Sequence, residues 1–210
     1  MGATDHPSPR KEHNYPIVRM GGIAMISGYM IAIIASTHIF QKYLLYDLSD
    51  LKIVYILLFG SLLSFLIGVS DDIFNLSPWP RLSLQIIMAS IIWSFNIRID
   101  NIIFTFNSWE IALPIYQSYL ITVIWIVGTI NAINWIDGID GLASGVSIIA
   151  CTGIIIIGGN SVYSSLTYLA SGILGSCIGF IPYNYNNNRI KKILMGDGGS
   201  YFLGFSISTL

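Results

Sequence analysis

The sequence predicts an all-α fold, a polytopic bundle of transmembrane helices that forms a single domain over residues 1–210. Hydrophobic residues make up 54% of the chain and charged residues only 10%, whereas soluble domains carry about 25% charged residues. The mean hydropathy is +0.69. The apolar residues gather in runs close to the roughly 20 residues that a helix needs to cross the hydrocarbon. Lipid is therefore expected to surround most of the chain.

Six apolar runs are expected to be complete membrane spans, with boundaries uncertain by a few residues. They cover residues 21–40, 51–69, 82–97, 114–130, 142–158 and 165–183. A seventh run begins at Tyr201 and continues to Leu210, the last residue of the sequence. Because the sequence stops inside this run, we expect the seventh span to be truncated and the chain to be a fragment.

The basic residues between the runs predict the orientation of the bundle. If the loops alternate between the two faces of the membrane, seven Lys and Arg residues lie on the N-terminal face and three on the other. Cytoplasmic loops carry the excess of Lys and Arg, so the N-terminal face is expected to be cytoplasmic. The first group is Arg10, Lys11, Arg19, Arg81, Arg189, Lys191 and Lys192, and the second is Lys42, Lys52 and Arg98.

Acidic residues gather on the same predicted face. They come from three loops that are far apart in the sequence, and a helix bundle can bring such loops together at one mouth. Carboxylates near the membrane plane are costly unless they bind or pair with something, which favours a functional site over scattered structural acids. These residues are Asp71, Asp72, Asp137, Asp140 and Asp197.

The adjacent pair Asp71 and Asp72 follows the second run, with Arg81 and Gln85 a few residues later. Adjacent carboxylates repel each other and therefore favour a bound cation or a shared proton. Taken alone, the pair is equally typical of a polar helix end capped by acids.

The segment 131–145 is the strongest local signal. Polar residues recur at every third position, and on a helix this spacing places them along one face. Its glycines would let a phosphate or a sugar approach the backbone closely. The alternating ligands and final Glu of an EF-hand are missing. The recurring residues are Asn131, Asn134, Asp137 and Asp140.

The segment 195–200 opens the seventh run with three glycines around Asp197. Backbone N–H groups at a helix start can hold an anion, and Asp197 beside them is suited to a divalent metal that bridges to phosphates. Mg²⁺ suits these ligands, because proteins bind it with one or two carboxylates together with phosphates and waters. Simple capping by Asp197 or Ser200 is the alternative.

In this order the motifs resemble the polyprenyl-phosphate N-acetylhexosamine-1-phosphate transferase family, glycosyltransferase family 4. The matching segments are residues 5–22, the pair Asp71–Asp72, residues 131–145 and residues 195–200. The family fold has about ten transmembrane helices. The resemblance therefore implies that one preceding helix and several later ones are missing here, together with a later loop that recognises the sugar.

The resemblance implies transfer of a sugar-1-phosphate, of N-acetylhexosamine type, from a UDP-sugar to undecaprenyl phosphate, with release of UMP, in cell-envelope polysaccharide biosynthesis. It places the chain in the bacterial cytoplasmic (inner) membrane, with the active site facing the cytoplasm. The partners would be the two substrates and membrane lipid, with no nucleic acid. The donor sugar, the pathway and a homodimeric assembly are left open.

The resemblance also assigns roles. Asp197 would be the principal ligand of Mg²⁺, or alternatively Mn²⁺, assisted by Asn134 and Asp137. Asp71 and Asp72 would be the catalytic pair, which orients or deprotonates the lipid phosphate, although a covalent Asp nucleophile is an alternative. Substrate-binding roles would fall to Asn131, Asp140, Asn184 and Gly196 on the nucleotide-sugar, and to Arg10, Lys11 and His13 as cations that attract phosphates.

Two other interpretations remain. A transporter or channel would also place ionisable residues in a helix bundle, but its path should carry polar groups at mid-membrane depth, and here the acids cluster at one end. A catalytically inert fragment that retains the motifs is the second.

Overall fold

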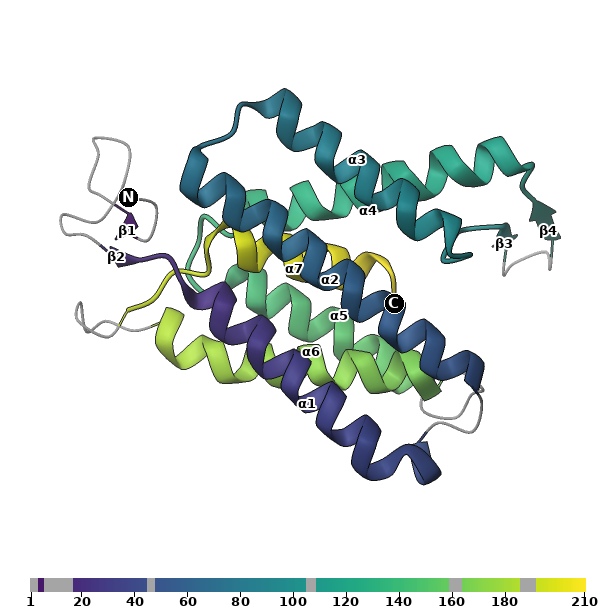
Figure 1. Cartoon of the computed structure of the whole chain (residues 1–210), viewed down its shortest axis with the longest axis horizontal. Helices are drawn as coiled ribbons and strands as arrows, with labels where there is room; N and C mark the ends of the chain where they lie inside the picture. The colour runs from purple at the N-terminus through teal and green to yellow at the C-terminus, as the bar shows by residue number, and fades with distance from the viewer. Residues whose placement is uncertain (1–3, 6–16, 45–47, 105–108, 159–163, 186–191) are drawn as a thin grey trace.

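A computed structural model describes the chain except for residues 1–3, 6–16, 45–47, 105–108, 159–163 and 186–191. The described residues form seven helices and two short hairpins, which confirms the predicted all-α bundle (Figure 1). The helices are α1 (Gly21–Leu44), α2 (Leu48–Phe74), α3 (Pro78–Ser94), α4 (Ile115–Ile136), α5 (Leu142–Gly158), α6 (Ser164–Asn184) and α7 (Gly196–Ser208). The antiparallel hairpins pair β1 (Thr4–Asp5) with β2 (Ile17–Val18) and β3 (Asn101–Phe104) with β4 (Trp109–Ala112).

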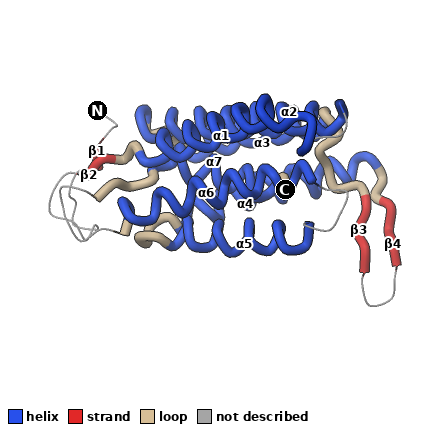
Figure 2. The backbone as a smooth tube through the Cα atoms, turned by 90° about the horizontal axis from the view of Figure 1, so that it is seen from below, coloured by secondary structure: helices blue, strands red, loops and turns tan. Residues whose placement is uncertain are grey.

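Successive helices run in alternating directions along the bundle (Figure 1). The α2–α3 turn, the α4–α5 loop and the start of α7 therefore lie at the same end as the N-terminus, which we call the polar end. The β3–β4 hairpin projects from the opposite end (Figure 2). The three acidic motifs, predicted on one face of the membrane, lie at one end of the bundle.

Four helical segments are long and apolar enough to cross a membrane, namely Gly21–Ile39, Leu51–Phe74, Ile115–Ile136 and Ser165–Asn184. Helix α5 is apolar but has 17 residues, and α3 has the same length. The pattern is that of a multi-pass membrane protein, with fewer full-length spans among the described residues than the six expected.

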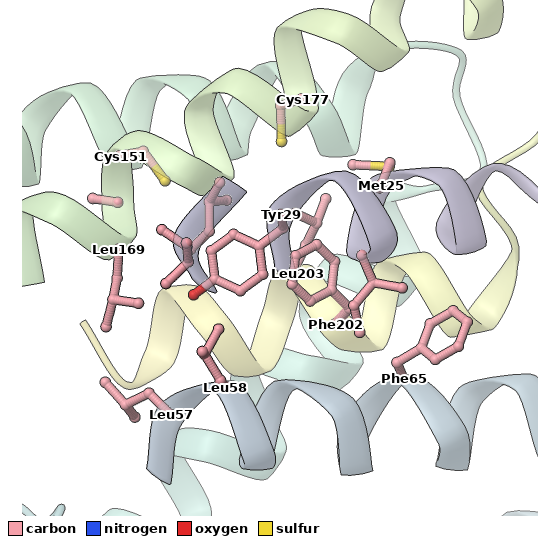
Figure 3. Packing of buried hydrophobic residues seen from close by; sticks show 14 of the residues in the cluster. Met25, Tyr29, Leu57, Leu58, Phe65, Cys151, Leu169, Cys177, Phe202 and Leu203 are labelled. Atoms are coloured by element: carbon pink, nitrogen blue, oxygen red, sulfur yellow. The ribbon is translucent and has the colours of Figure 1, made fainter. Parts of the chain in front are cut away.

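Helix α7 lies in the centre of the bundle and contacts α1, α2, α4, α5 and α6. Nearly all of its residues are buried, because the other helices surround it. Figure 3 shows Phe202 of α7 beside the Tyr29 ring of α1, with Leu58 of α2 nearby. The Tyr29 and Phe202 rings are 5.3 Å apart. The helix that carries Asp197 is thus fixed on several sides.

Two helix ends differ from the predicted boundaries in ways that matter for the site. Helix α2 continues past residue 69 to Phe74, so Asp71 and Asp72 lie in its last turns. Helix α4 continues past residue 130 to Ile136, so Asn131 and Asn134 lie on its final turns. Polar residues extend these helices because each finds a partner on a neighbouring helix.

Candidate active site

Asp71 joins the polar ends of three helices. Its Oδ2 accepts a hydrogen bond from Arg81 Nη1 of α3 at 3.0 Å and another from the Tyr201 hydroxyl of α7 at 3.1 Å. The side chain is 5% exposed. A buried carboxylate is tolerated when it is paired and hydrogen-bonded, so these two donors account for the burial of Asp71.

Asp72 faces the first turn of α7. Its Oδ2 accepts a hydrogen bond from the Gly198 N–H at 3.1 Å, and Arg19 Nη1 lies 3.8 Å from its Oδ1. Oδ1 is buried and has no hydrogen-bond partner among the described residues. A helix N-terminus attracts anions, and here the protein's own carboxylate occupies one of these N–H groups.

Asn134 and Asp197 are in direct contact across α4 and α7. The Asn134 amide Nδ2 donates to Asp197 Oδ1 at 2.8 Å and to the Ser200 hydroxyl at 3.0 Å. The one-face spacing predicted for 131, 134 and 137 directs Asn134 at α7. Two of the three predicted metal ligands therefore touch each other.

Asp137 directly follows α4 and is half-buried. Burial raises the pKa of its carboxyl to about 8, and the negative charge of Asp197 adds to the effect. Asp72 and Asp140 act in the same direction. The positive charge of Arg19 acts against these three carboxylates.

The predicted metal ligands are Asp197, Asn134 and Asp137, of which the first two are in direct contact. Among the residues that the structure describes, no group of three His, Cys, Asp or Glu side chains is placed to hold one ion. Asp72, which accepts from the Gly198 N–H, and Asp197, which accepts from Asn134, present carboxylate oxygens at the start of α7. These hard oxygen ligands fit Mg²⁺, which keeps several waters and takes few protein ligands.

Asn131 lies one turn before Asn134 and is held by a residue for which no role was predicted. Its Nδ2 donates to Gln85 Oε1 of α3 at 2.7 Å and to the Val127 carbonyl at 2.8 Å. Gln85 is fully buried. The signal that could have found it is its position four residues after Arg81, on the same face of α3.

Asn184 braces two loops at the polar end. Its Oδ1 accepts a hydrogen bond from the Gly141 N–H at 2.6 Å, and its Nδ2 donates to the Ile193 carbonyl at 3.1 Å. Gly141 has a φ of +73°, a conformation that favours glycine. The structure thus gives Asn184 two backbone partners in loops that lead to the site.

Replacing Asn184 by alanine should lower the free energy of unfolding by about 1–3 kcal/mol, because it leaves two backbone groups without their partner. The measurement is thermal unfolding of the purified chain in detergent. Tyr185→Phe is the matched control, since the Tyr185 side chain is 74% exposed. Equal melting temperatures for both variants would contradict the bracing role.

Asp140 and Gly196 are two further residues of the predicted substrate-binding set. Asp140 is exposed and forms an ion pair with Lys192, so it joins the α4–α5 loop to the segment before α7. Gly196 has a φ of +76°, and a Cβ there would lie 2.9 Å from Asp72 Oδ2. Arg10, Lys11 and His13, predicted to attract phosphates, lie outside the described residues.

Tyr201 is the second residue of the site that sequence reasoning missed. Tyr201 is the first residue of an apolar run that is typical of a membrane span, where an aromatic side chain usually packs against other helices. Its contact with Asp71 depends on the rotation of α7, which no local pattern reveals.

Known proteins were compared with the chain. The sequence model described as glycosyl transferase family 4 matches residues 54–210. A "probable undecaprenyl-phosphate N-acetylglucosaminyl 1-phosphate transferase" of Bacillus subtilis is 35% identical over 100% of this chain and 55% of its own length. An undecaprenyl-phosphate alpha-N-acetylglucosaminyl 1-phosphate transferase of Haemophilus influenzae is 30% identical over 99% of this chain and 56% of its own length.

A decaprenyl-phosphate N-acetylglucosaminephosphotransferase of Mycolicibacterium smegmatis is 28% identical over 99% of the chain and 52% of its own length. The chain thus spans about half the length of the curated relatives that it matches. The family match covers well over half of the chain and includes all three acidic motifs. The chain belongs to glycosyl transferase family 4.

Proposed function

We propose that this chain carries the reaction centre of an enzyme that transfers a sugar-1-phosphate from a UDP-sugar to undecaprenyl phosphate. One observation carries the proposal. Three motifs distant in the sequence meet at one end of a membrane bundle, where Asp72 contacts Gly198 and Asn134 contacts Asp197. The names of the relatives support polyprenyl phosphate as acceptor and N-acetylglucosamine 1-phosphate as the transferred group.

The reaction joins two anions. An oxygen of the lipid phosphate attacks the phosphorus next to the sugar, the P–O bond to the uridylate breaks, and UMP leaves with that electron pair. The products are polyprenyl diphosphate sugar and UMP. Because both substrates repel each other, the protein's task is positioning and charge neutralisation more than covalent chemistry.

Mg²⁺ is the proposed cofactor, with Mn²⁺ as the alternative. Asp197, Asn134 and Asp137 would hold it through the oxygen ligands that such ions prefer. Bound there, it would neutralise charge that develops on the leaving phosphate. The hydrogen bond from Asn134 fixes the direction of the Asp197 carboxylate, as a neighbouring polar group does for many metal ligands.

The remaining polar residues have roles around this centre. Asn131, Asp140 and Gly196 are proposed to contact the nucleotide-sugar, and Gly196 keeps space open beside Asp72. Asn184 supports the same region by holding its loops. An aspartate of the 71–72 pair would contact the acceptor phosphate.

The location follows from the substrates. A nucleotide-sugar is water-soluble and a polyprenyl phosphate is anchored in lipid, so the centre must lie where the bundle meets water. We place the polar end at the cytoplasmic face of the bacterial inner membrane, because basic residues concentrate in the loops of that end.

The test uses membranes that carry the chain and, in parallel, a hybrid in which the chain replaces the matching segment of the Bacillus subtilis relative. UMP release is followed with UDP-GlcNAc, undecaprenyl phosphate and Mg²⁺, and the relative itself is the positive control. Release should require all three additions and stop with EDTA. If the relative releases UMP and neither the chain nor the hybrid does so with any UDP-sugar, the proposal fails. Substrate-driven flux into vesicles without UMP release would favour a transporter.

A further inference from the structure

We propose that the two adjacent aspartates have different tasks, with Asp72 contacting the reactants and Asp71 acting as a positioning residue that holds Arg81 and Tyr201. This inference rests on the proposed function and deepens it. The pair sits on consecutive positions of α2, so the two side chains point in directions about 100° apart around the helix axis. They meet different neighbours for that reason.

Asp71 is committed to the interior of the protein. Two donors from two helices, the Arg81 guanidinium and the Tyr201 hydroxyl, reach the same carboxylate oxygen at 3.0 and 3.1 Å. Tyr201 is fully buried and Asp71 is 5% exposed. A ligand that used this oxygen would have to displace two charge-assisted or buried hydrogen bonds, which are the strong ones in proteins.

Asp72 differs from Asp71 in its partners, although its side chain is only 8% exposed. One oxygen accepts the Gly198 N–H, and the other has no hydrogen bond among the described residues. Burying an unsatisfied carboxylate oxygen is costly, and such an atom in a native structure is typical of a functional group. The nearest cation, Arg19, is 3.8 Å away, longer than a hydrogen bond.

The space beside Asp72 supports the same division. A pocket of about 140 Å³ between α1, α2 and α7 is lined by Arg19 and Asp72 together with apolar side chains and the glycines of α7. Asp71 does not line this pocket. Arg19 and Asp72 therefore present one cation and one carboxylate to the same space, whereas Asp71 is directed at Arg81 of α3 and Tyr201 of α7.

The division predicts different responses to asparagine and alanine at the two positions. An asparagine at 71 keeps an oxygen that can accept from Tyr201 and Arg81, whereas alanine removes it. At position 72 the negative charge of the carboxylate acts on the reactants. Asparagine and alanine both remove that charge, so both should lower turnover equally. A pair of equivalent catalytic residues would instead respond in the same way at both positions.

The test measures UMP release and melting temperature for D71N, D71A, D72N and D72A in the hybrid protein. We expect D71N to release UMP at least tenfold faster than D71A, and D71A to melt at a lower temperature than the parent. D72N and D72A should each lower kcat at least a hundredfold, and their kcat values should agree within a factor of two. D72N should melt at the same temperature as the parent.

Two results would overturn the inference. The first is that D71N melts at the same temperature as the parent but is as inactive as D71A. The second is that D72N retains more activity than D71N. A parent hybrid that releases no UMP would count against the proposed function instead. The melting temperatures would then still decide between the tasks, because Asp71 joins three helices through Arg81 and Tyr201 whereas Asp72 has one hydrogen bond to the backbone of α7.

Discussion

Replacing Asp197 by asparagine should lower turnover by about 10³-fold while the protein stays folded. That factor corresponds to about 4 kcal/mol of transition-state stabilisation, the range expected when a metal-binding carboxylate is removed. The fold should survive, because an asparagine keeps an oxygen that accepts from Asn134 and loses a charge whose burial is unfavourable. The measurement is kcat for UMP release together with thermal unfolding.

The matched control is Asp100→Asn at the opposite end of the bundle. Asp100 also pairs with polar neighbours, since it accepts from Arg98 Nε and from the Ser118 hydroxyl, each at 3.0 Å. The control variant should retain turnover within a few-fold of the parent. If Asp197→Asn does the same, Asp197 is not a ligand of the catalytic ion.

Gly68→Ala should lower turnover by about 10²-fold through a shift of the backbone that carries Asp197. A Cβ on Gly68 would lie 2.6 Å from the carbonyl carbon of Asp197 and 2.7 Å from the Gly198 Cα. These are backbone atoms of a helix that is packed on several sides, so α2 and α7 must move apart. Displacements of about 1 Å at a reaction centre can cost this much, and overpacking costs about 1–3 kcal/mol of stability.

Gly60→Ala separates loss of stability from loss of the site. Gly60 lies on the same helix and also packs on α7, but its Cβ would meet side chains, at 2.7 Å from Phe205 Cε1 and 2.8 Å from Ile92 Cδ1. We expect it to lower the melting temperature and to retain turnover. If both variants lose turnover in proportion to their stability, the close approach of α2 to α7 serves packing alone.

The fold followed closely from composition and periodicity, because lipid leaves few alternatives to helices. The predicted start of the first span at Gly21 and the bounds of α5 agree with the structure. The helix ends were less accurate where polar residues continue a helix, as at Asp71 and Asp72. Their hydrogen-bond partners lie on other helices, and hydropathy carries no information about such contacts.

The candidate site could be predicted in its location and residue types but not in its pairing. Spacing along α4 indicated that Asn131 and Asn134 share a face, and the structure directs one at Gln85 and the other at Asp197. Spacing could not reveal that Asn184 holds the backbone on both sides, because that depends on the path of two loops. The β3–β4 hairpin was also missed, since its apolar strands are too short to differ from loop residues.

The central position of α7 has a consequence for how the protein is made. Gly196–Ser208 contains four glycines and three serines, small residues that let neighbouring helices approach closely. Helix α7 is synthesised after the other described helices. Packing of α7 should therefore wait for the earlier helices to form a cavity that accepts it. The contact between Asp197 and Asn134 therefore forms only when α7 has packed against α4.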